Sequence, residues 1–128
     1  MLFGKNTVVV IIGILAAIAI PVFLGQRADA ADARARANVR EAALAVNVVY
    51  TETGNAPANV AALNGSGFQQ STPQVFMNAT GTAATADWCV ISISDGGNQP
   101  VWWMTEADGA PQGGTQAAAT AAGCPTAS

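Results

Sequence analysis

An unbroken apolar run close to the N-terminus constrains this chain more than any other feature. From Val8 to Leu24 every residue is aliphatic, aromatic, glycine or proline, and the run continues directly into an alanine-rich segment with charged residues. A secretory signal peptide instead joins a short apolar region to a small-residue cleavage site and a change of character. We therefore expect the run to stay in the working protein, in contact with lipid or with other apolar helices.

The run has the length of a membrane-spanning helix, but two of its residues weaken a helix. Thr7 to Leu24 make about 27 Å of α-helix, at the lower limit of a bilayer span. Lys5 lies just before them, where its amine can reach a membrane surface. Gly13 lowers helix propensity and Pro21 removes a backbone hydrogen bond, so we expect a kink or local unwinding there. A plain membrane anchor has no use for these two weak points.

The helix is expected to continue beyond the apolar run and to become amphipathic. Alanines and charged residues interleave over 27–41, and Asp32 and Arg36 have the favourable order for an i, i+4 pair. Gly54, with Pro57 soon after it, is typical of a helix end. Apolar residues recur every three or four positions and form a stripe that needs a sheet or loop packed on it. The stripe consists of Val39, Ala42, Ala43, Val46, Val49 and Tyr50.

The rest of the chain has the signals of turns and strands. β-branched and aromatic residues are concentrated in short segments separated by glycine, asparagine and proline. We expect a three- or four-stranded antiparallel sheet over the helix stripe, which makes the fold class α+β, with a head on a helical stalk. The predicted segments are a loop at Asn55–Gly67 with a helical turn at Asn59–Leu63, strands at Gln74–Asn78, Trp88–Ser94 and Val101–Thr105, and a hairpin turn at Asp95–Asn98.

Composition argues against catalysis and against binding to polyanions. The chain is 51% hydrophobic and only 10% charged, with a net charge of −3 and no histidine. Histidine is the commonest general base and metal ligand. We therefore expect a protein that is not an enzyme, with no cofactor and no specific nucleic-acid site. A calcium site is an alternative for four acidic residues, but they lack the Asp-x-Asp-x-Asp pattern and we interpret them as solvated turn residues. These are Asp87, Asp95, Glu106 and Asp108.

The two cysteines, Cys89 and Cys124, are expected to form a disulfide. A thiol pair behind an export-type N-terminus is typical of an oxidising compartment. The bond closes a loop of about 36 residues and ties down the tail 111–128, which is too rich in small and polar residues to be held by burial. Two free thiols or a redox pair are the alternatives, and the absence of a C-x-x-C motif argues against redox chemistry.

The adjacent Trp102 and Trp103 are the large side chains with the best prospect of a role beyond folding. Neighbouring residues in a strand point to opposite faces of the sheet. We expect one indole to pack on the helix and the other to be exposed or at a contact with another subunit, where aromatic residues concentrate binding energy. Carbohydrate binding or electron relay is the alternative.

The segment Ile12–Leu24 resembles the N-terminal helix of type IV pilins and of the related pseudopilins. Gly25–Arg27 and Tyr50–Gly54 resemble the pilins of Gram-positive actinobacteria in particular. The resemblance covers about the first 54 residues and implies a pilin fold, in which the apolar helix is first a membrane anchor and then the packed core of an extracellular filament. It also implies that the stretch Gly13–Pro21 unwinds in assembled pili. The chain departs from the family at Gly4, where the family carries a glutamate, and in lacking the glycine-phenylalanine peptidase site.

These features together predict three segments and a structural function. The segments are an apolar membrane or filament-core helix (1–25), an amphipathic helix half (26–54) and a β head with a disulfide-tied tail (55–128). The predicted function is the major pilin of a type IV pilus at the cell surface. Identical copies would form the helical filament, served by the assembly machinery and its inner-membrane platform and held in the cytoplasmic membrane beforehand. A major pseudopilin of a type II secretion system and a single-pass surface-displayed binding protein are the alternatives. The residues expected to pack in the filament core are Val9, Ile11, Ile12, Ile14, Leu15, Ile18, Ile20, Phe23 and Leu24.

Overall fold

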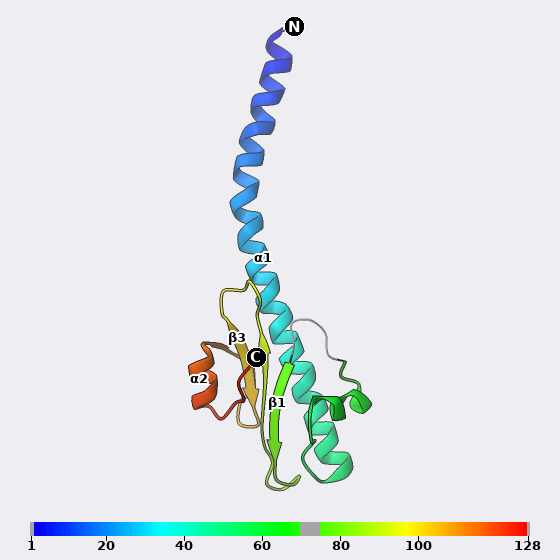
Figure 1. The fold of residues 1–128 in the computed structure, drawn as a ribbon. Coiled ribbons are helices and arrows are strands. Elements are labelled where there is room, and N and C mark those ends of the chain that lie inside the picture. Colours follow the sequence, from blue (N-terminus) through cyan, green and yellow to red (C-terminus); the bar gives the residue numbers. More distant parts are fainter. Residues whose placement is uncertain (1, 70–74, 128) are drawn as a thin grey trace.

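One long helix carries a small antiparallel sheet on its C-terminal half (Figure 1). The computed structural model describes residues 2–69 and 75–127, without the side chains of residues 2–5 and 18–24. Helix α1 runs from Leu2 to Thr53. Its first part projects away from the rest of the chain, and we call residues 2–24 the stem and the remainder of the chain the head. The α+β class and the helix-plus-sheet layout agree with the prediction from sequence.

Helix α1 is continuous through both positions where a break was expected. The backbone is helical at Gly13 and at Pro21, so the single chain does not unwind at either position, and a kink stays a prediction. A proline costs about 3 kcal/mol in a helix interior and a glycine about 1 kcal/mol. The helical turns on either side of Gly13 and Pro21 offset these costs, and the helix of 52 residues stays continuous through both positions. Unwinding inside a filament stays a prediction. Four of the predicted filament-core side chains lie outside the described residues, namely those of Ile18, Ile20, Phe23 and Leu24.

The C-terminal end of α1 is set by Gly54, as the sequence predicts. Gly54 has a φ of 76°, a left-handed conformation that glycine adopts without steric cost, and its amide donates to the carbonyl of Tyr50 at 2.9 Å. The Tyr50 hydroxyl donates in turn to the carbonyl of Thr80 at 2.6 Å and joins the helix to the sheet. Burial, together with the nearby carboxylates of Asp87 and Glu106, raises the pKa of this phenol.

The head contains a four-stranded antiparallel sheet in the order β1-β2-β3-β4. The central hairpin is the one predicted, and its register pairs Ile91 with Trp103 and Ser92 with Trp102. The predicted start of the first strand, Gln74, lies outside the described residues. The fourth strand and a short helix come from the tail segment 111–128, for which no separate strand or helix was predicted from the sequence. The elements after α1 are η1 (Val60–Ser66), β1 (Val75–Thr80), β2 (Asp87–Ile93), β3 (Val101–Thr105), β4 (Gln112–Gly114) and α2 (Gln116–Ala121).

One face of the sheet packs on α1. Trp88 and Val90 of β2 point to this face, and Leu63 and Phe68 from the η1 segment close the same cluster. The predicted stripe of α1 is buried in full, so the 3.6-residue period identified the covered side of the helix correctly. Its members are Val39, Ala42, Ala43, Val46, Val49 and Tyr50.

The other face of the sheet is covered by α2 and the C-terminal segment. Cys89 and Cys124 form a disulfide with their Cα atoms 5.2 Å apart, which confirms the predicted pairing and leaves neither thiol free. The Asn78 side chain donates to the carbonyl of Gly123 at 2.7 Å and accepts from the amide of Cys89 at 3.1 Å. The C-terminal segment is thus fastened to the sheet by one covalent bond and a hydrogen-bonded side chain. A second cluster fills this face, made of Cys89, Ile91, Val101, Trp103, Ala119 and Cys124.

Candidate functional site

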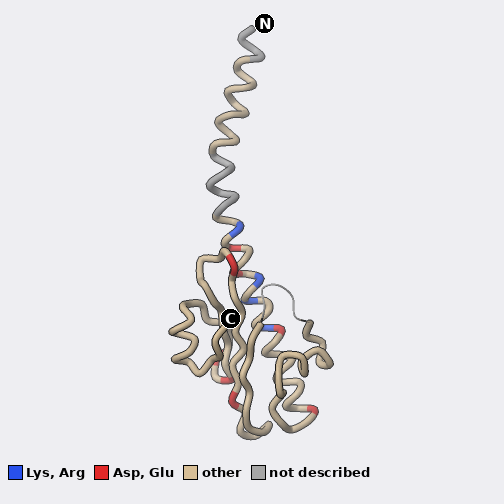
Figure 2. The backbone as a smooth tube through the Cα atoms, viewed as in Figure 1, with Lys and Arg blue, Asp and Glu red and all other residues tan. Residues whose placement is uncertain are grey.

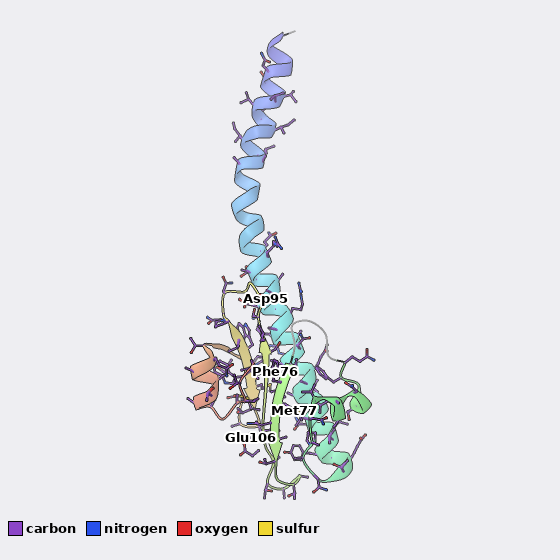
Figure 3. All side chains as sticks on the ribbon, in the orientation of Figure 1. Phe76, Met77, Asp95 and Glu106 are labelled. Atoms are coloured by element: carbon purple, nitrogen blue, oxygen red, sulfur yellow. A yellow bond between two sulfur atoms is a disulfide. The ribbon has the colours of Figure 1, made fainter. Side chains whose placement is uncertain are left out.

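The stem presents apolar side chains on every side. Successive residues of an α-helix are rotated by about 100°, so a consecutive run covers the whole circumference. Side chains radiate from the stem in Figure 3, and the stretch 6–17, whose side chains the structure describes, contains no charged residue (Figure 2). Each large apolar side chain here is between 51% and 67% exposed in the single chain. They are Val8, Val9, Val10, Ile11, Ile12, Ile14 and Leu15, and they include five of the predicted filament-core residues.

An apolar surface of this kind marks an interaction site. Soluble monomers rarely expose contiguous apolar patches larger than a few hundred Å².

Within the parts of α1 whose side chains the structure describes, no stretch is both long enough and apolar enough to cross a membrane.

A buried carboxylate joins the β2–β3 hairpin to α1 just beyond the stem. Asp32 is only 5% exposed, although it lies among charged and alanine residues in the sequence. The loop between β2 and β3 wraps its carboxylate: the Ser94 hydroxyl donates at 2.7 Å, and the amides of Asn98 and Gln99 donate at 2.9 and 3.3 Å. The indole Nε1 of Trp102 supplies a fourth hydrogen bond at 3.1 Å. We call these five residues the Asp32 cage.

The Asp32 cage stabilises the charged form of the carboxylate by hydrogen bonds. Burial by itself raises the pKa of a carboxyl group, but the hydrogen bonds from Ser94, Trp102 and the two backbone amides outweigh it and lower the pKa of Asp32 from 3.8 to about 2. The neighbouring Asp29 adds an outer contact, since it accepts from the Asn98 side chain at 2.9 Å. The loop is thus attached to two successive turns of α1.

The predicted Asp32–Arg36 ion pair is wrong. The Arg36 guanidinium lies over the Trp102 ring, 5.0 Å from its centroid, in a cation–π contact. The Asp32 carboxylate turns to the hairpin because four neutral donors converge on it there. The sequence carried a signal for this arrangement: Asp32 precedes Val39 by seven residues, two helical turns, and is in phase with the buried stripe.

Neither adjacent tryptophan is exposed in the single chain, so of the two expected alternatives, exposure or contact with another subunit, the first is wrong. Trp102 is half-buried on the α1 side and Trp103 is buried on the α2 side. The prediction that the two indoles lie on opposite faces of the sheet is confirmed. The sequence did not predict that β4 and α2 cover the face that holds Trp103. Cβ atoms at Gly113 and Gly114 would lie 2.8 Å from the Trp102 ring and 3.1 Å from the Trp103 ring, so the glycines of β4 make room for both indoles. Contact of Trp102 or Trp103 with another subunit stays a prediction.

The four acidic residues considered for calcium do not all meet in one cluster, although Asp87 and Glu106 both lie near Tyr50. Asp95 lies at the stem-proximal end of the head and Glu106 farther along it (Figure 3). Glu106 accepts from the amide of Trp88 at 3.2 Å, and Asp108 accepts from the amide and hydroxyl of Thr105 at 3.1 and 3.0 Å. Within residues 6–17, 25–69 and 75–127, no group of three or more acidic or cysteine side chains is placed to hold a metal ion.

Comparison with known proteins adds no relative to this description. No family model, curated protein or solved structure matches the chain.

Proposed function

We propose that this chain is the major pilin of a type IV pilus, a subunit of an extracellular filament built from identical copies. The observation that carries the proposal is the stem, a single helix that is apolar on all sides, exposed in the single chain and continuous with the helix that organises the head. The similarity of Ile12–Leu24 to pilin helices and the α+β head agree with this function. We observe an α+β layout of a long helix and a small sheet, and we propose that this layout is a pilin fold.

Burial of the stem against other stems supplies the free energy of assembly. Moving a valine, leucine or isoleucine side chain from water to an apolar interior gains about 1.5–3 kcal/mol. With seven such side chains exposed on the described stem, association of several copies is strongly favoured over monomers in water. The gain from lipid is smaller, so extraction of copies held in the cytoplasmic membrane is left to an assembly machine.

The Asp32 cage contributes by fixing the head on its stem. It lies about eight residues beyond the stem and attaches the β2–β3 loop and β3 to α1 by four hydrogen bonds to one carboxylate, three from the loop and one from β3. A helical filament requires each head to hold the same orientation relative to its stem. A rigid junction at this point meets that requirement.

The proposal is tested on material sheared from the surface of cells that make this chain. Negative staining should show thin filaments, and mass spectrometry should identify this chain as their main component. The double variant Gly13→Leu and Pro21→Leu should retain membrane association but form few or altered filaments, whereas Ala117→Leu, on exposed helix α2, should assemble normally. Recovery of the wild-type chain only as detergent-solubilised monomers would refute the proposal. Short assemblies confined beneath an outer envelope layer would favour a pseudopilin.

A further inference from the structure

The head carries a second exposed apolar surface. Leu44 is 67% exposed and Val48 is 37% exposed, one helical turn apart on the side of α1 that the sheet and η1 leave uncovered. Outside the stem, these are the large apolar side chains that the described part of the chain leaves exposed. We call Leu44 and Val48 the outer strip.

Leu44 projects between two shallow hollows. The first has a volume of about 230 Å³ and lies between α1, which contributes Arg40 to its lining, and Met104 of β3 with Gly109 of the following loop. The second has a volume of about 340 Å³ and lies along α1, with Val48 and Thr51 in its lining. A rod-shaped apolar partner can therefore contact Leu44 on both sides.

The stem contains a complementary depression at Gly13. A Cβ atom at Gly13 would meet nothing within 4 Å, and Ala16 and Ala17 follow on the same side one turn later. Val9 lies one turn before Gly13 on the same side, and Ile14 lies beside Gly13 around the helix. A projecting leucine that enters a depression between helical turns is the packing found between helices in coiled coils and membrane bundles.

We infer that the outer strip of one copy receives the stem of a second copy, with Leu44 seated at Gly13. The inference rests on the proposed function, since it names the contact through which copies join. The occupant is a second copy because the stem is the other uncovered apolar surface in the described part of the chain, and it has the rod shape and the depression that the strip fits.

The contact has a geometric consequence. Strip and stem are different surfaces, so each copy keeps a free stem and a free strip for further copies, and the assembly grows as an open helix. Thirty-one residues separate Gly13 from Leu44, which is about 46 Å along an α-helix. Two parallel copies joined in this way are offset by about that distance along the filament.

Cysteine cross-linking in filaments tests this contact. The chain has only two cysteines and both are bonded to each other, so introduced cysteines are the free thiols. Gly13→Cys and Leu44→Cys are placed in one chain, produced as a minority among wild-type copies so that filaments still form, and oxidised. Disulfide-linked dimers are expected on non-reducing gels, in an amount that rises with the share of variant chains, and none from Gly13→Cys with Ala117→Cys. Filaments without the Gly13–Leu44 link would overturn the inference and leave the proposed function standing, whereas absence of wild-type filaments would refute both.

A second comparison does not depend on cross-linking. Leu44→Glu is expected to lower filament yield at least tenfold, because it places a carboxylate against an apolar stem. Ala117→Glu adds the same charge on exposed α2 and should leave the yield unchanged. Both variants should unfold at the same temperature as the wild-type monomer in detergent. Normal filament yield from Leu44→Glu would contradict the inference.

Discussion

The hydroxyl of Ser94 donates a hydrogen bond of 2.7 Å to the carboxylate of Asp32, across 62 positions of the sequence. Both residues are buried, and the bond fastens the loop after β2 to α1 close to the stem. The same oxygen of Asp32 accepts from the Trp102 indole, so one side chain of the helix is attached to the loop and to β3. Stability of the head and its orientation on the stem therefore depend on the same carboxylate.

Replacement of Asp32 by alanine should lower the free energy of unfolding by about 3 kcal/mol. The change leaves the Ser94 hydroxyl, the Trp102 indole and two backbone amides without their acceptor in a buried site. Denaturant unfolding of the full chain in detergent, followed by tryptophan fluorescence, measures the loss. Asp29→Ala is the matched control, since it removes an exposed acceptor of one hydrogen bond and should cost about 0.5 kcal/mol or less. Equal losses for the two variants would argue against the Asp32 cage.

The pH dependence of stability should show the titration of Asp32. Its pKa is about 2 in the folded chain and 3.8 as the unperturbed value, so the unfolded chain binds the proton more readily between these limits. The contribution is complete above about pH 4 and is lost as the pH falls towards 2, by up to about 2 kcal/mol. Asp32→Asn should lack this part of the acid loss. An identical acid profile for Asp32→Asn and the wild type would exclude a lowered pKa at this site.

Gly97 should tolerate no side chain. A Cβ atom there would collide with the carboxylate of Asp32 and the hydroxyl of Ser94. Gly97→Ala is therefore expected to push the loop away from α1 and to cost about 2 kcal/mol. Gly109→Ala is the control, because a Cβ at Gly109 meets nothing within 4 Å, and it should change stability by about 0.5 kcal/mol or less. Thermal unfolding compares the two, and a Gly97→Ala chain as stable as Gly109→Ala would disprove the tight approach.

Removal of the disulfide should loosen the C-terminal segment before the rest of the head. The double variant Cys89→Ser and Cys124→Ser is expected to lose about 2–4 kcal/mol of stability. Limited proteolysis should cut within 111–127 first, because α2 and β4 are then held mainly by the small cluster around Ala119. Cleavage that begins instead in the η1 segment would show that the disulfide is not what fastens this end of the chain.

Much of the architecture could be predicted from local patterns. The apolar stem, the stripe ending at Tyr50, the Gly54 end of the helix and the β2–β3 hairpin each have a period or a turn signal within a few residues. The pairing of Cys89 with Cys124 followed from the presence of just two cysteines and from the expectation of an oxidising compartment.

The remaining features depend on contacts between distant segments. β4 is three residues long and two of them are glycines, so only the indoles that lie across it explain its place in the sheet. Asp32 and Arg36 have a favourable i, i+4 spacing within the helix. The β2–β3 hairpin, however, supplies four hydrogen-bond donors to Asp32, and these cannot be inferred from the helix sequence alone. The continuity of α1 at Pro21 likewise depends on the stability of all the turns of a long helix, which outweighs the cost of one proline.

A reconstruction of filaments from the native chain at side-chain resolution tests the central claim most directly. We predict that Ile11 and Leu15 are surrounded by apolar side chains from neighbouring copies, with heads outside and stems in the core. A filament in which these two residues face solvent or lipid, or a preparation that yields only single chains in detergent, would contradict it.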